Sequence, residues 1–168
     1  EEAQQERRLT QVREIQNALG SGRLDLFYQP LCATTASLPI DRCEVAVGIR
    51  TASDDYIPRH DVTEVAARYQ LSADIDRWLI NASLEALRSD HPVLSDMRVL
   101  LIPLSAQSVG DDRLLEYAIR SVREHGEVAN RIGFSLPEAG IAQHLEFVRY
   151  FITTLKQDGC QFMISDLG

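Results

Sequence analysis

The side chains best suited to bind a ligand or take part in chemistry lie where short apolar runs of the sequence end. The best defined run is Arg42–Arg50, Arg-Cys-Glu-Val-Ala-Val-Gly-Ile-Arg, which finishes on an arginine. A guanidinium is a planar fork of N–H donors that matches phosphate and carboxylate groups. Arg50 is therefore a candidate for holding an anionic ligand, provided that the fold gathers such ends in one place.

Five apolar runs of this kind read as strands, and helical patterns separate most of them. The expected strands cover residues 23–30, 45–49, 99–104, 132–136 and 162–164. The expected helices cover residues 1–19, 61–71, 72–89, 111–125 and 141–157. Gly20 and Gly22 are expected to end the first helix, whereas Asp61 and Ser72 are expected to cap the second and third.

Repeated strand–helix units predict an α/β fold with a parallel sheet and helices outside it. The spacing suits a (β/α) barrel of the TIM type, whose chemistry sits at the C-terminal strand ends. A full barrel takes about 250 residues, whereas the 168 residues end at the fifth strand. An open five-stranded α/β sheet is the other arrangement considered, and we predict an incomplete barrel whose remaining strands belong to sequence beyond Gly168.

The N-terminal segment is predicted to be a separate element. Residues 1–22 form an amphipathic linker helix with a sparse apolar stripe, and residues 23–168 form the barrel part. A charged helix at this place is typical of a chain that continues from an upstream domain.

Composition excludes several classes of protein. The net charge of −8 argues against a general nucleic-acid or anionic-membrane surface. No apolar run approaches the roughly 18 residues of a membrane span. The three cysteines have no metal-ligand spacing, and Cys43 and Cys160 stand in apolar runs, which favours buried reduced thiols and a cytoplasmic location.

Several short motifs, in order, resemble the EAL domain family of cyclic di-GMP phosphodiesterases and their non-catalytic relatives. They are Tyr28-Gln29-Pro30, Ile49-Arg50, Ile75-Asp76-Arg77-Trp78-Leu79, Leu104-Ser105, Pro137-Glu138 and Asp166-Leu167-Gly168. The resemblance covers residues from about 23 to 168 and implies the first two-thirds of an EAL barrel.

The second strand departs from the family pattern Glu-x-Leu-x-Arg. With Arg50 as anchor, Ala46 stands at the metal-binding glutamate and Gly48 at the leucine. Glu44 lies two residues earlier, about 6–7 Å down the strand at about 3.3 Å per residue. Shifting the alignment by two residues would restore the glutamate and lose the arginine.

Three further strand ends have lost metal ligands that the resemblance implies. Pro103 replaces an asparagine, Ser135 a glutamate and Ser165 the first of two aspartates. The family chemistry needs two divalent ions with several hard oxygen ligands each. The pattern therefore predicts no Mg²⁺ or Mn²⁺ site, no cofactor and no catalysis: an inactive phosphodiesterase homologue.

The polar residues that match the family pattern suggest that ligand binding is kept although catalysis is lost. The resemblance places Gln29, Arg50, Asp76, Glu138 and Asp166 at a pocket for cyclic di-GMP, with the arginine on phosphate and the acids on guanine N–H groups. It implies a degenerate EAL receptor similar to FimX-like proteins of type IV pilus systems and twitching motility. Such a receptor would bind a PilZ-type adaptor and could dimerise through neighbouring domains.

Two other functions remain open at this stage. One is a protein-interaction scaffold that has also lost the nucleotide, which Gly48 favours because it removes packing beside the ligand. The other is a weak cyclic di-GMP phosphodiesterase with unusual ligands. For single residues, the alternatives to ligand contact are structural: an ion pair at Arg50 and a helix-terminal role for Asp76 or Glu138.

Overall fold

A mixed five-stranded sheet forms the centre of the protein. The computed structural model describes residues 1–31 and 41–165. The strands lie in chain order: β1 Leu24–Pro30, β2 Arg42–Ile49, β3 Val99–Pro103, β4 Ile132–Pro137 and β5 Gln161–Ser165. β1 runs antiparallel to β2, and every later neighbour is parallel. The α/β prediction with a largely parallel sheet is confirmed.

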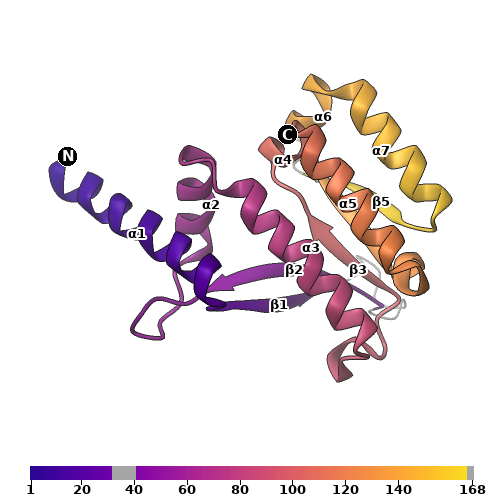
Figure 1. Ribbon diagram of the computed structural model, residues 1–168, viewed down its shortest axis with the longest axis horizontal. Helices are drawn as coiled ribbons and strands as arrows, with labels where there is room; N and C mark the ends of the chain where they lie inside the picture. The colour runs from indigo at the N-terminus through magenta and orange to yellow at the C-terminus, as the bar shows by residue number, and fades with distance from the viewer. Residues whose placement is uncertain (32–40, 166–168) are drawn as a thin grey trace.

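Helices follow most strands and cover one face of the sheet. They are α1 Glu2–Ser21, α2 Arg59–Arg68, α3 Ser72–Arg88, α4 Ala106–Val109, α5 Asp112–Glu124, α6 Glu138–Gln143 and α7 Leu145–Gln157, with 3₁₀ turns at Pro92–Leu94 and Gly126–Arg131. Figure 1 shows α3, α5 and α7 side by side, and α5 contacts both of the others. No helix in the described parts of the chain is long and apolar enough to cross a membrane.

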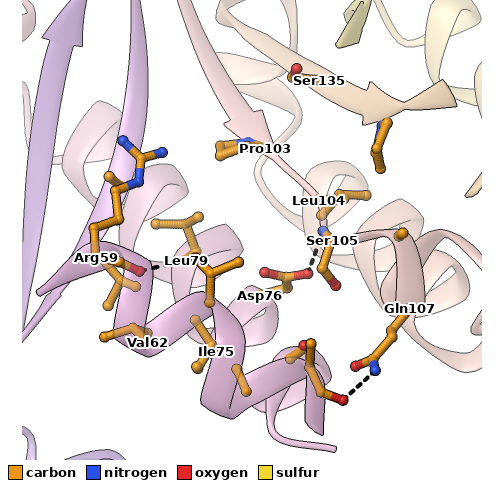
Figure 2. A pocket seen from close by; sticks show the side chains of 18 of the residues that line it. Arg59, Val62, Ile75, Asp76, Leu79, Pro103, Leu104, Ser105, Gln107 and Ser135 are labelled. Carbon is orange, nitrogen blue, oxygen red and sulfur yellow. Dashed lines mark hydrogen bonds between the residues drawn. The ribbon is translucent and has the colours of Figure 1, made fainter. Parts of the chain in front are cut away.

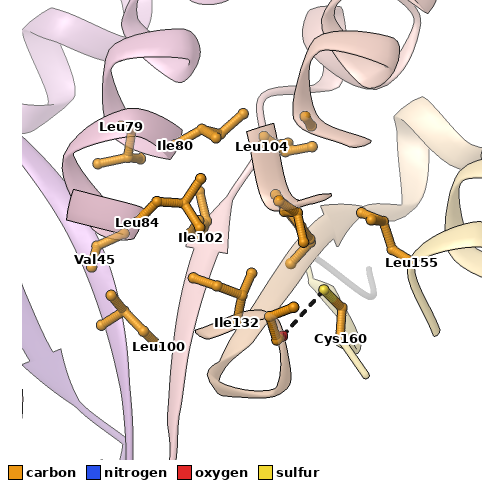
Figure 3. Packing of buried hydrophobic residues seen from close by; sticks show 14 of the residues in the cluster. Val45, Leu79, Ile80, Leu84, Leu100, Ile102, Leu104, Ile132, Leu155 and Cys160 are labelled. Atoms are coloured by element: carbon orange, nitrogen blue, oxygen red, sulfur yellow. Dashed lines mark hydrogen bonds between the residues drawn. The ribbon is translucent and has the colours of Figure 1, made fainter. Parts of the chain in front are cut away.

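The main core lies between the sheet and these helices (Figure 3). Strand residues Val45, Leu100, Ile102 and Ile132 are buried against Leu84 and its neighbours on α3. The first four belong to one face, because alternate residues of a strand point the same way and paired residues share a face. Burying each such side chain contributes roughly 1.5–3 kcal/mol, so this face fixes the strand register.

A second, smaller core joins α1 and α2 to the edge of the sheet. Ile15 and Ala18 of α1 are fully buried with Ile49, Val62 and neighbouring residues. Polar contacts continue the α1–α2 interface, since Arg8 Nη2 donates to Glu64 Oε1 at 2.8 Å and Gln11 Nε2 to Asp61 Oδ2 at 2.8 Å. One side of α2 is therefore held by α1.

Trp78 packs against both cores. Cys43 and Cys160 are buried free thiols, as predicted. The Cys160 thiol donates to the Ala129 carbonyl at 3.4 Å, and burial raises its pKa to about 12. Cys32 lies outside the described residues.

Several expected helix boundaries are wrong. α1 continues through Gly20 and ends with Gly22 in the left-handed conformation at φ 71°, a geometry that glycine adopts without strain. α2 starts two residues before Asp61, after Pro58, and the Asp61 carboxylate accepts from Gln11 of α1 instead of capping. Ser72 is the first residue of α3 and makes no cap, because Leu71 before it is already in helical geometry.

The helix expected over residues 141–157 is divided in two. The backbone leaves helical geometry at His144 (φ −133°), which separates α6 from α7. By contrast, Asp111 caps α5 by accepting from the backbone N–H groups of Arg113 and Leu114.

Candidate functional site

The strand ends converge on the face of the sheet opposite the helices. The register pairs Phe27 with Ala46 and Pro103 with Ser135. Pro137 is paired with Ser165 one layer further along. Paired residues point to the same face, and this inner face is the one that would enclose the interior of a barrel.

A pocket of about 500 Å³ opens between these strand ends, α2 and the start of α3 (Figure 2). Small-molecule sites in proteins commonly span about 300–1,000 Å³. The sheet contributes Glu44, Ala46, Val47, Pro103, Ser135, Pro137 and Ser165; α2 contributes Arg59, Val62, Thr63, Ala66 and Ala67; α3 contributes Ser72, Ile75, Asp76 and Leu79; residues 104–107 complete the wall. Most of the wall is apolar, with a few polar groups placed around it.

Asp76 is the predicted site residue that lines this pocket. Its side chain is only 6% exposed, and its Oδ2 accepts a hydrogen bond from the Ser105 backbone N–H at 2.9 Å. Burial raises the pKa of the carboxyl, while hydrogen bonds from Ser108 and Ser105 oppose that rise. Asp76 thus ties α3 to the turn after β3, where Ser105 Oγ accepts from the Ser108 N–H and begins α4.

Arg50 lies beyond the pocket wall and is held by two carboxylates. Its Nε is 2.9 Å from Asp25 Oδ2, and its Nη1 donates to Asp54 Oδ1 at 3.1 Å. The Tyr56 hydroxyl donates to the same Asp25 oxygen at 2.7 Å, and this hydrogen bond raises the pKa of Tyr56. The local geometry is the structural ion pair that was considered for Arg50 as the alternative to ligand contact.

Two of the remaining predicted residues, Gln29 and Glu138, are not among the residues that line the pocket. Gln29 is exposed on β1 opposite Glu44. Glu138 is exposed at the first residue of α6, where an acid suits the helix N-terminus. Asp166 lies outside the described residues.

The four positions that lack the family's metal ligands do come together. Ala46, Pro103, Ser135 and Ser165 all line the pocket, and none has a carboxylate or amide. Two divalent ions need several hard oxygen ligands each, so the residues present do not fit a two-metal centre. In the described residues there is also no group of three or more His, Cys, Asp or Glu that could hold a metal ion.

Sequence reasoning overlooked one polar residue of the pocket, Arg59, and the role that the buried hydroxyl of Ser135 could play there. Arg59 stands at the first turn of α2, with Nη2 3.8 Å from Glu44 Oε1. Ser135 is buried, and its hydroxyl has no hydrogen-bond partner among the described residues. The sequence signal for Arg59 is its place directly after Pro58, at the start of the helix that follows β2.

Comparison with known proteins assigns the family. The chain matches the EAL domain over residues 12–168, so it belongs to the EAL domain family. It is 22% identical over 161 residues to the cyclic di-GMP phosphodiesterase PdeF of Escherichia coli K12; that match covers 96% of this chain and 21% of PdeF. The chain thus spans about a fifth of this curated relative.

Solved structures share the fold. The FimX EAL domain of Pseudomonas aeruginosa, bound to c-di-GMP, is similar with a TM-score of 0.75 at 23% identity, over 94% of this chain and 62% of that chain. The FimX EAL domain of Xanthomonas citri with c-diGMP gives a TM-score of 0.74 at 18% identity, over 96% and 62%. A c-di-GMP-bound LapD fragment from Vibrio cholerae gives 0.80 at 14% identity, over 95% and 38%. The fold is that of part of an EAL barrel, as predicted.

Proposed function

We propose that this protein is a non-catalytic receptor for cyclic di-GMP. The observation that carries the proposal is the convergence of Ala46, Pro103, Ser135 and Ser165 on one pocket at the strand ends. The family resemblance puts hydrolysis at these strand ends, and the four positions that it assigns to metal ligands here carry only apolar or hydroxyl side chains. A site of this composition can enclose a nucleotide without activating water.

The polar groups of the wall suit a ligand with hydrogen-bonding edges. The buried Ser135 hydroxyl lacks a partner among the described residues, and a buried polar group without one costs about 1–3 kcal/mol. A guanine or ribose group placed there would satisfy it. Asp76 supplies an acceptor on the opposite wall. Gln29, Glu138 and Asp166 remain proposed secondary contacts of the same ligand.

The relay to other proteins belongs to the same proposal. A receptor that does not turn over its ligand must pass on the bound state through contacts, and we assign that role to a protein partner such as a PilZ-type adaptor. Type IV pilus control and twitching motility would be its output, in the cytoplasm where cyclic di-GMP signalling takes place.

Calorimetry and a product assay test the proposal on the full-length protein. Titration with cyclic di-GMP should give saturable heat at one site, and incubation with Mg²⁺ or Mn²⁺ should release no linear dinucleotide above background. An Ala46→Glu variant serves as a matched control, because one restored acid does not rebuild a two-metal centre. Clear turnover by the wild type would make the protein an enzyme, and absence of binding heat would remove the receptor function.

One observation favours a second function, that of a protein-interaction scaffold without nucleotide. Arg50, the residue on which the family resemblance places phosphate, is already neutralised by Asp25 and Asp54. A pull-down with the adaptor separates the two functions. Association that ignores added cyclic di-GMP supports the scaffold, whereas association that depends on it supports the receptor.

A further inference from the structure

The pocket contains one cationic side chain among the described residues that line it. That residue is Arg59, whose side chain is 61% exposed. Its Nη2 is 3.8 Å from Glu44 Oε1, which is beyond hydrogen-bond length. Figure 2 shows its guanidinium on the same side of the pocket as Pro103. Arg59 can therefore turn to an incoming anion without breaking a hydrogen bond to Glu44.

Arg50 is in the opposite situation. Its guanidinium contacts Asp25 and Asp54 at 2.9 and 3.1 Å, and Asp25 is held in turn by the Tyr56 hydroxyl. Releasing Arg50 to a ligand would leave two carboxylates without their cation. The cost is smaller at Arg59, which has Glu44 as its one carboxylate in ion-pair range among the described residues, at 3.8 Å.

We propose that Arg59 is the phosphate anchor of this pocket and that Arg50 serves to hold the β2 end. The inference rests on the proposed receptor function and names the group that binds the ligand's charge. An arginine fork pairs with a phosphate through two parallel N–H···O bonds. The Arg59 site therefore suits a phosphodiester or another phosphate-bearing nucleotide.

The acidic groups that face the site are compatible with an anion. Glu44 and Asp76 are the described carboxylates on the pocket wall. The Asp76 carboxyl accepts from the Ser105 N–H at 2.9 Å, and this donor offsets part of its repulsion of a phosphate. Glu44 repels the anion, but it is close to Arg59 and keeps that guanidinium near the pocket in the absence of ligand.

Isothermal titration of the full-length protein with cyclic di-GMP tests the assignment through four variants. Arg59→Ala should weaken binding roughly 10- to 100-fold, since a hydrogen bond to a charged group contributes about 1.5–3 kcal/mol and 1.4 kcal/mol is tenfold. Arg59→Lys should fall in between, because it keeps the charge and loses the fork. Arg68→Ala is the matched control: it removes an exposed arginine from the same helix away from the pocket. Arg50→Ala should lower the melting temperature, and it should weaken binding less than Arg59→Ala does.

The outcomes distinguish this inference from the receptor function. Cyclic di-GMP binding that survives Arg59→Ala and disappears in Arg50→Ala overturns the assignment and leaves the receptor intact. If cyclic di-GMP gives no heat, the same variants are titrated with cyclic di-AMP, linear pGpG and pyrophosphate. Arg59-dependent binding of one of these supports the anchor and rejects cyclic di-GMP as the ligand. If the wild type binds none of the four compounds, the phosphate anchor is wrong.

Discussion

Replacing Asp76 tests whether the buried carboxylate holds the pocket wall together. Asp76→Ala removes the acceptor of the Ser105 N–H, which is 2.9 Å away. Losing a hydrogen bond to a charged group costs about 1.5–3 kcal/mol, and relief from burying the carboxylate offsets part of that. We expect a net loss of about 1–2 kcal/mol in the free energy of unfolding. Asp76→Asn keeps an oxygen acceptor and should lose less than about 1 kcal/mol.

The pH dependence gives a second, independent readout. Burial makes the folded carboxyl hold its proton more tightly than the unfolded one. Between the two pKa values the folded state therefore binds more protons, so this group's contribution to stability falls as pH rises. Below about pH 4, the ordinary aspartate range, the contribution vanishes. Wild type should thus lose stability relative to Asp76→Asn as pH is raised from below 4, and the difference should become constant above the folded pKa.

Urea unfolding at several pH values measures both effects. At neutral pH the Asp76→Ala transition should lie about 2–8 °C lower in a matched thermal scan, at about 2–4 °C per kcal/mol for a domain of this size. An Asp76→Ala protein as stable as wild type would refute the account. So would an Asp76→Asn protein whose stability follows the wild-type pH profile, because the titrating group would then be another residue.

Three further changes have defined expectations. Gly48→Leu should lower stability by about 1–3 kcal/mol, because the Phe27 ring occupies the place of its Cβ; the double variant with Phe27→Ala should recover part of that loss in a double-mutant cycle, and strict additivity would contradict the contact. Phe134→Ala should cost about 3–5 kcal/mol in chemical unfolding, since the ring is fully buried 5.3 Å from that of Phe151, and a loss below 1 kcal/mol would contradict that packing. The Cys160 thiol, with its pKa near 12, should resist iodoacetamide at about pH 8 in the native protein and react after unfolding in guanidinium; rapid native labelling at this residue would show that it is not buried.

The sheet was predictable because its signal is local. Continuous apolar runs such as 45–49 and 99–104 have the composition of strands buried on both faces, and turn residues mark their ends. The parallel order then follows from the intervening helices. Helix starts were less predictable. Asp61 and Ser72 are residue types that often cap helices, but the Asp61 carboxylate accepts from Gln11, and Ser72 follows a residue that is already in helical geometry.

Sequence reasoning brought together several residues of the candidate pocket and missed others. Asp76 and the four altered positions were placed from motif order, and they share one pocket. The pairing of Arg50 with Asp25 depends on the antiparallel β1–β2 register, in which Asp25 lies opposite Gly48. The pairing of Arg50 with Asp54 depends on a turn in which Asp54 has φ 69°. Neither relation can be read from strand periodicity, and Arg59 was missed because its place at the pocket depends on how α2 lies over the sheet.

The position of α2 has a thermodynamic consequence for the whole chain. The same ten-residue helix supplies one wall of the pocket and the surface on which α1 is fastened through Glu64 and Asp61. A ligand that prefers one placement of α2 must therefore also prefer one placement of α1, and the coupling free energy is equal in both directions. A protein bound to α1 would change the affinity of the pocket for its ligand by some factor, and the ligand would change the affinity of α1 for that protein by the same factor. Binding at the N-terminal helix α1 would then be coupled to binding in the pocket through the position of α2.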